Sequence, residues 1–118
     1  MMQEFLEVHT TIDSKEAAQR IAEAIVSQRL AACVQVSGPI TSTYWWQGKL
    51  EQAEEWLCTM KTRRDLYEKL EQAIRAVHSY DEPEILATLV AMGSRGYLEW
   101  VVRETNLLDG HQDTNTPA

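Results

Sequence analysis

The segment from residue 78 to 81 brings together the side-chain types of a hydrolytic triad. It reads His78-Ser79-Tyr80-Asp81, so a base, a hydroxyl group and a carboxylate follow one another in the chain. Adjacent residues on a turn seldom meet in the line of hydrogen bonds that a triad needs. The chain also has no glycine-rich phosphate loop, no Cys-x-x-Cys pair and no zinc-binding helix with paired histidines. The sequence therefore predicts that the protein is not an enzyme.

Other polar side chains are placed where a binding site could form. Glu55 and Lys61 alternate with apolar residues so that both fall on one face of a strand. They could form an ion pair, within the chain or between subunits, or they could be polar anchors in a cleft between subunits. Tyr80, Pro83 and Glu84 form a rigid turn, for which a structural role and a ligand-lining role both stay open.

Two histidines, His9 and His78, could each have an ordinary structural role. His9 falls at the end of a predicted strand, where a partly exposed imidazole can hydrogen-bond to the backbone. His78 falls at the end of a predicted helix, where it can satisfy the last carbonyl groups and complement the helix dipole. A role for His78 in a site is equally open.

Composition limits the classes of protein that fit. A length of 118 residues suits one domain, and a net charge of −7 disfavours binding to nucleic-acid phosphates. No stretch approaches the roughly 20 apolar residues of a membrane span. The N-terminus lacks the basic region of a signal peptide, so we expect a cytoplasmic protein that does not bind membranes. In that compartment Cys33 and Cys58 are predicted to be buried, reduced thiols.

The first elements to position these residues are a strand and a helix. Residues from about Glu4 to Thr10 are β-prone, and Asp13 with Glu16 resembles a capping box at a helix start. From Ser14 to Leu30 apolar residues recur at spacings of three and four, which predicts an amphipathic helix packed on a sheet.

The stretch from Cys33 to Thr62 predicts one long β-hairpin. Gly38-Pro39 indicates a bulge in its first strand, and the polar run from Gln47 to Gln52 indicates the turn. An arm of some 13 residues reaches roughly 43 Å, whereas a compact chain of this length is only about 35 Å across. The tip should therefore overhang with exposed aromatic side chains, which favours burial against further copies of the chain. These side chains are Tyr44, Trp45, Trp46 and Trp56.

The remaining elements complete a known topology. A second helix should start with Thr62 and Asp65 as caps and end near His78, followed by a strand from Glu84 to Met92 that is covered on both faces. A short third helix and a disordered tail, residues 109–118, should follow. The order βαββαβ predicts an α+β, ferredoxin-like domain over residues 1–108, with an antiparallel sheet and an appended C-terminal helix.

Four ordered motifs resemble those of the CutA divalent-cation-tolerance family. The resemblance covers about residues 4 to 106, and the motifs stand at similar separations. They are Ala31-Ala32-Cys33-Val34, Tyr44-Trp45-Trp46-Gln47-Gly48-Lys49-Leu50-Glu51, Lys61-Thr62 and His78-Ser79-Tyr80-Asp81-Glu82-Pro83-Glu84-Ile85.

The resemblance implies a cytoplasmic homotrimer, a fold like that of the PII signalling proteins, and an association with copper tolerance and copper binding. Proposed copper ligands of the family match His9, where family members can have a cysteine, and His78. A pair of histidines suits Cu(II), but the lost thiolate removes the strongest preference for Cu(I). Glu84, Asp81 or a neighbouring subunit would have to add further ligands.

Three functions fit these observations. The first is a trimeric copper-binding protein with His9 and His78 as ligands. The second is a PII-like signalling module that binds a small molecule or a protein in the clefts between subunits, near Lys61, Glu55, Tyr80 and Glu84. The third is an assembly platform without a ligand.

Overall fold

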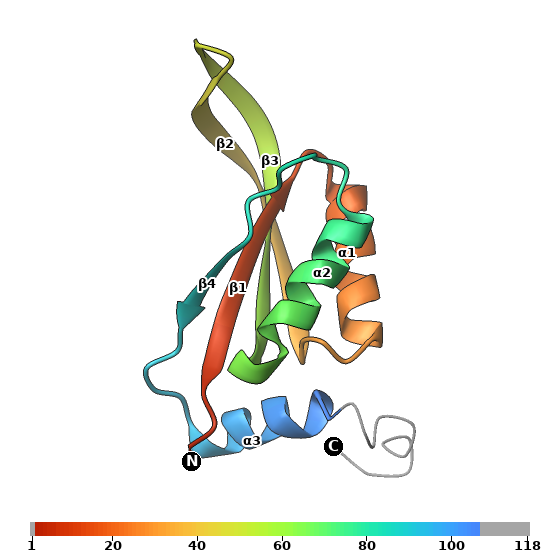
Figure 1. The fold of residues 1–118 in the computed structure, drawn as a ribbon, viewed down its shortest axis with the longest axis vertical. Helices are drawn as coiled ribbons and strands as arrows, with labels where there is room; N and C mark the ends of the chain where they lie inside the picture. Colours follow the sequence, from red (N-terminus) through yellow and green to blue (C-terminus); the bar gives the residue numbers. More distant parts are fainter. Residues whose placement is uncertain (1, 107–118) are drawn as a thin grey trace.

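The computed structural model describes residues 2–106 and shows an α+β fold with one antiparallel sheet. Three helices accompany the four strands of this part of the chain (Figure 1). The elements are β1 Phe5–Ile12, α1 Lys15–Ser27, β2 Cys33–Trp46, β3 Lys49–Arg63, the 3-10 turn η1 Arg64–Leu66, α2 Tyr67–Val77, β4 Leu86–Leu89 and α3 Arg95–Glu104. The predicted βαββαβ order with an appended helix is confirmed.

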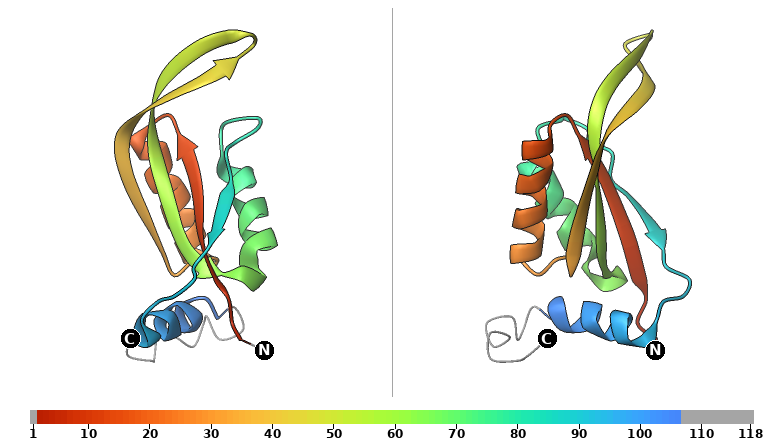
Figure 2. Two further views of the ribbon diagram at one scale, coloured as in Figure 1. Left: turned by 90° about the vertical axis from the view of Figure 1, so that its left-hand side faces the viewer. Right: turned by 180° about the vertical axis from the view of Figure 1, so that it is seen from behind.

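The sheet has the strand order β2-β3-β1-β4, and α1 and α2 cover one of its faces (Figure 1). Alternate side chains of β1 and β3 enter the core between sheet and helices, as the period of two in a strand requires. The buried core includes Val8, Ile21, Ile25, Met60 and Leu70. The other face of the sheet is open except at its lower end, where α3 crosses (Figure 2).

The first helix starts and ends differently from the prediction. Its N-cap is Ser14, whose hydroxyl accepts a hydrogen bond from the Ala17 N–H at 3.1 Å, and not Asp13. Serine is among the best N-cap residues because its oxygen satisfies a free backbone donor. The helix ends at Ser27 rather than Leu30, since Arg29 adopts a left-handed conformation with φ 62°.

The hairpin of β2 and β3 is the most extended part of the molecule. It projects well beyond the body (Figure 1), and the molecule measures 51 × 27 × 22 Å along its principal axes. The predicted bulge is confirmed by a register shift between Ser37 and Ile40. The turn is tighter than the predicted polar run, because only Gln47 and Gly48 leave the strands. Both have positive φ, 51° and 79°, which is typical of a two-residue type I′ turn.

The second helix begins without the predicted side-chain caps. The Thr62 side chain is buried in β3 and donates to the Leu30 carbonyl at 2.7 Å, so it cannot cap α2. The turn η1 leads into the helix instead. The predicted end at His78 is confirmed, because this residue is the C-cap with extended backbone.

The prediction for the last strand is wrong in both its length and its burial. Only Leu86–Leu89 pair with β1, and all four residues are exposed, Leu86 by 60%. The strand lies at the edge of the sheet, so it has one neighbouring strand and few atoms over its faces. The third helix is confirmed as α3, and the predicted disordered tail, residues 109–118, lies outside the described residues.

Candidate functional site

His78 uses both ring nitrogens in hydrogen bonds to the backbone. Its Nε2 lies 2.8 Å from the Thr11 carbonyl oxygen, and its Nδ1 lies 3.1 Å from the Tyr80 backbone nitrogen. A backbone N–H can only donate and a carbonyl can only accept, so Nδ1 must accept and Nε2 must carry the proton. This pattern fixes His78 as a neutral imidazole that joins the end of β1 to the turn after α2.

Tyr80 extends the same connection to the hairpin. Its hydroxyl donates to Glu55 Oε2 at 2.8 Å, and its ring packs edge-on against the His78 ring with centroids 4.7 Å apart. Burial raises the pKa of the Tyr80 hydroxyl, and the hydrogen bond to the Glu55 carboxylate raises it further. The phenol therefore stays a donor throughout the physiological pH range.

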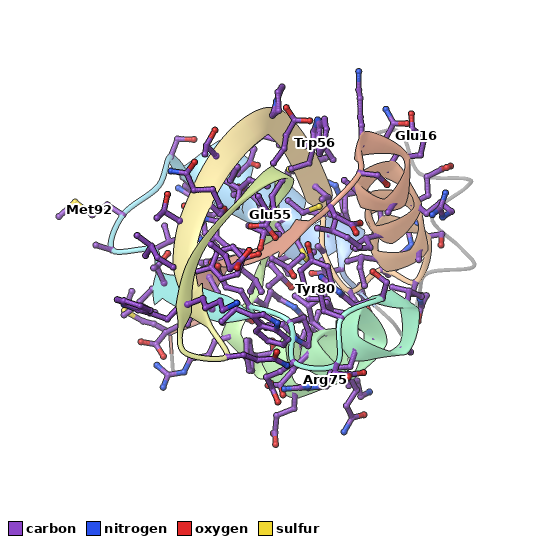
Figure 3. All side chains as sticks on the ribbon, turned by 90° about the horizontal axis from the view of Figure 1, so that it is seen from above. Glu16, Glu55, Trp56, Arg75, Tyr80 and Met92 are labelled. Atoms are coloured by element: carbon purple, nitrogen blue, oxygen red, sulfur yellow. The ribbon has the colours of Figure 1, made fainter. Side chains whose placement is uncertain are left out.

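Glu55 is a buried carboxylate at the base of the projecting arm. It is only 8% exposed, and Figure 3, which looks down on the molecule from the hairpin end, shows it at the centre of the structure with Tyr80 beside it. Within residues 2–106 no basic side chain lies within 4.0 Å of it. A buried charge is costly unless it is paired or hydrogen-bonded, so the Tyr80 hydroxyl stabilises this carboxylate.

Glu55 lies at the point where the hairpin leaves the body of the sheet. The last pair between β1 and β3 is Ile12 with Trp56, and the next residue, Glu55, is paired only with Ile40 on β2. We call Ile40, Glu55 and the bulge at Gly38 the arm root. Beyond it the hairpin is a two-stranded ribbon, with which no third strand of residues 2–106 pairs.

His9 lies apart from this connection, on the open face of the sheet. It is half-buried and is paired with Thr59 on β3 and Leu86 on β4. Within the described part of the chain, no three His, Cys, Asp or Glu side chains converge as a metal ion would require. Two imidazoles are suitable donors for a divalent cation, but this conformation completes no site, and the exposed Glu84 does not complete one either.

Lys61 and Glu55 share a face of β3 but do not interact. Lys61 donates to Gln35 Oε1 at 2.8 Å and lies 3.7 Å from Glu7, whereas Glu55 is bound by Tyr80. Six residues of strand separate them by about 20 Å. The predicted pairing is therefore not formed within the chain. Nothing in the sequence pattern indicated that Gln35 and Glu7 would hold Lys61.

The two thiols have different surroundings. Cys58 is fully buried, and burial raises its pKa to about 11. Cys33 is half-exposed at the start of β2, with its Sγ 3.6 Å from the Tyr97 hydroxyl, so the prediction that both thiols are buried is wrong for Cys33. Its side chain lies on the open face of the sheet, which the helices α1 and α2 do not cover.

This difference predicts selective reaction with a disulfide reagent. At about pH 8 only about 0.1% of Cys58 would be thiolate, because the pKa is raised, and Cys33 should react about 100-fold faster or more. The absorbance change with an aromatic disulfide measures both rates. A Cys33→Ser variant should keep only the slow phase, and two equal rates in the native protein would contradict the assigned burial.

Apolar side chains at the hairpin tip are exposed in the single chain. Trp45 is 73% and Trp46 61% exposed, and Tyr44 and Leu50 beside them are exposed as well. Trp56 differs, because it is half-buried and packs against the chain's own core. The sequence places all four aromatic residues together, but Trp56 is still paired with Ile12 of β1 and so lies over the body of the sheet.

Comparison with known proteins identifies relatives of the whole fold. A family model described as CutA1 divalent ion tolerance protein matches residues 6–104. The divalent-cation tolerance protein CutA of Thermus thermophilus is 42% identical over 95 residues, which are 80% of this chain and 92% of that protein. The chloroplastic protein CutA 1 of Oryza sativa is 42% identical over 98 residues, 83% of this chain and 55% of that protein. The chain thus spans about half the length of its plant relatives.

Solved structures agree with this assignment. The crystal structure of CutA1 from Oryza sativa superposes with a TM-score of 0.85 at 40% identity, covering 87% of this chain and 94% of that one. The Thermus thermophilus protein superposes with a TM-score of 0.83 at 41% identity, covering 89% and 100%. None of the helices in residues 2–106 combines the length and the apolar composition that a membrane span requires. With a family model that matches nearly all of the described chain, this protein belongs to the CutA family of divalent-ion tolerance proteins.

Proposed function

We propose that the chain acts as a homotrimer in divalent-cation tolerance and that copper is the cation it binds. The observation that supports the proposed assembly is the projecting arm, whose tip exposes apolar side chains in a single chain. These side chains are Tyr44, Trp45, Trp46 and Leu50. Monomeric proteins seldom leave such a patch in water, and a second copy of the same chain is the commonest partner. Packing of the arms against neighbouring copies would bury it.

His9 and His78 are the proposed copper ligands. Both lie near β1, because His9 is part of this strand and His78 contacts the carbonyl of Thr11, two residues further along it. Neutral imidazole is a good ligand for Cu(II). Because these two residues do not complete a site, a further ligand such as Glu84, Asp81 or a group of a neighbouring subunit is part of the proposal.

The ligand assignment predicts that a His9→Ala, His78→Ala double variant binds Cu(II) at least about tenfold more weakly, since both imidazole donors are gone. Calorimetric titration of the assembled protein with a copper(II) salt measures the dissociation constant. His111→Ala removes the remaining histidine of the chain and is the matched control. Unchanged copper affinity in the double variant would refute the assigned ligands.

The alternative function, a PII-like module that binds a small molecule or a protein in the clefts between subunits, has weaker support. Its support from the sequence is the fold, which is observed, and the pairing of Lys61 with Glu55. These two residues do not pair, because each has a different partner in the chain. The cytoplasmic location also stays a prediction, because relatives have names that include "chloroplastic" and "periplasmic".

A further inference from the structure

We infer that the helix α3 is a flap over the thiol of Cys33, fixed at its C-terminal end and able to lift at its N-terminal end. The closed flap shields this thiol at the lower end of the open face (Figure 2), and the open flap exposes it to reagents in solution. α3 lies at the end of the molecule opposite the hairpin tip (Figure 1). The flap therefore requires neither a bound ligand nor any movement of the arm.

Two arginines from other elements hold the C-terminal end of α3. Arg29, in the loop after α1, donates through Nη1 to the Glu104 backbone carbonyl at 3.2 Å and lies 2.9 Å from the Glu104 carboxylate. Arg63, at the end of β3, donates to the Thr105 carbonyl at 3.1 Å. Cations at a helix C-terminus satisfy its free carbonyl groups and complement its dipole. Val101 and Thr105 are also buried, so this end of the helix is well fixed.

The backbone of Arg29 indicates that its side chain is needed for this contact. Arg29 has φ 62°, in the left-handed region that favours glycine, and it follows the C-cap of α1. A residue with a Cβ is less stable there than glycine. Glycine would suit the turn better, so the contribution of the arginine is its contact with α3. Arg29 and Arg63 are thus positioning residues for the flap.

The N-terminal end of α3 lacks the features that stabilise a helix start. Its N-cap residue, Ser94, makes no side-chain hydrogen bond to the helix, and the first turn has no acidic residue. Arg95 places a positive charge at the positive end of the helix dipole, and Gly96 adds backbone freedom that disfavours a helix. An isolated helix of ten residues is marginal in water, so this end depends on its packing.

This weakly held end carries the side chain that covers Cys33. The Tyr97 hydroxyl lies 3.6 Å from Cys33 Sγ. Burial, and then the hydrogen bond with Cys33, raise the pKa of the Tyr97 hydroxyl to about 12, so the contact is made by a neutral phenol. A thiol is a weak hydrogen-bonding group, and Tyr97 is still 43% exposed. Lifting the first turn of α3 therefore breaks few interactions.

Two variants should change the flap in opposite directions. Gly96→Ala adds a Cβ that meets no atom within 4 Å and favours the helix, so Cys33 should react about 2- to 5-fold more slowly with an aromatic disulfide. Arg29→Gly keeps the left-handed turn but removes the contact with Glu104, so Cys33 should react about 3- to 10-fold faster. In this reaction the Cys33 thiolate bonds to one sulfur of the reagent, and the aromatic thiolate that leaves is measured by its absorbance.

Each variant has a control elsewhere in the chain. Gly48→Ala makes the same substitution at the hairpin tip, and Arg75→Gln removes an arginine that is bound to two carboxylates but lies in α2. Both should leave the Cys33 rate as it is in the native protein. Hydrogen exchange measured by mass spectrometry on the assembled protein should fall in residues 94–100 of Gly96→Ala and rise there in Arg29→Gly, about threefold or more each. Exchange in residues 5–12 should not change.

Opposite changes of the Cys33 rate in Gly96→Ala and Arg29→Gly, with both controls unchanged, support the flap. Native Cys33 rates in these two variants overturn it, because α3 would then not limit access to the thiol. Exchange that rises in residues 5–12 as much as in residues 94–100 of Arg29→Gly also overturns it, because the whole chain and not the helix would be opening.

Discussion

Trp46→Glu should convert the proposed homotrimer into monomers. Trp46 is 61% exposed in the single chain and stands in a group of exposed apolar side chains beside the turn at the tip of the hairpin. Tryptophans in such positions often contribute 2 kcal/mol or more to an interface, and a buried unpaired carboxylate adds a further cost of roughly 3 kcal/mol. Because a closed trimer repeats the defect in each copy, we expect assembly to fail. Size-exclusion chromatography with light scattering measures the mass.

Val26→Glu is the control for this variant. Val26 is also an exposed apolar residue, but it lies on α1, in the helix layer away from the arm. The same change of charge there should leave the mass at that of the native assembly. Circular dichroism should show native secondary structure for both variants, since neither side chain belongs to the core. A Trp46→Glu protein that remains trimeric would mean that the interface lies elsewhere.

Gly38→Ala should cause the second large effect, a loss of about 2 to 5 kcal/mol in the free energy of unfolding. Gly38 has φ +154°, a conformation that residues with a Cβ rarely adopt. An added Cβ would also lie 2.6 Å from Trp56 Cδ1 and 3.1 Å from the Glu55 carbonyl oxygen. Neither the half-buried indole nor the strand backbone can move far, so the bulge at the arm root would have to distort. Denaturant unfolding at one fixed protein concentration measures the loss.

Gly48→Ala separates the two causes of this loss. Gly48 also has a positive φ, 79°, but no atom lies within 4 Å of an added Cβ. Its replacement should cost only the backbone term, about 1 kcal/mol. The larger loss in Gly38→Ala then reports the contact with Trp56 and Glu55 together with the greater backbone strain at φ 154° than at φ 79°. Equal losses would show that the close packing at Gly38 contributes nothing.

The long hairpin and its bulge could be predicted from local chemistry. The alternation of apolar and polar residues around Trp56, Cys58 and Met60 predicts the second strand of the hairpin. Gly38-Pro39 predicts the bulge in the first strand, because proline cannot donate to the hydrogen-bond ladder of a sheet. The sequence predicts too long a turn at the tip, because the residues after Gly48 are polar although they are paired in β3. Polarity alone does not separate a loop from an exposed strand.

The site could be predicted only as separate residues. His78, Tyr80 and Glu55 were each singled out, but Tyr80 and Glu55 are 25 positions apart and no periodicity relates a turn to a distant strand. The tautomer of His78 depends on which backbone groups surround it, and the sequence does not contain that information. The exposed β4 was missed for a related reason: an apolar run predicts that something covers it, but not whether the cover belongs to the same chain.

The exposed edge strand β4 makes a newly synthesised chain prone to aggregate before it assembles with other copies. With Leu86 and Leu89 uncovered, a solitary chain presents free amides and carbonyls to any other strand, which is how disordered aggregates begin. The net charge of −7 opposes such encounters, because like-charged chains repel one another at long range whatever their orientation. Only a fit close enough to offset that repulsion would then persist, so the net negative charge disfavours loose association between copies.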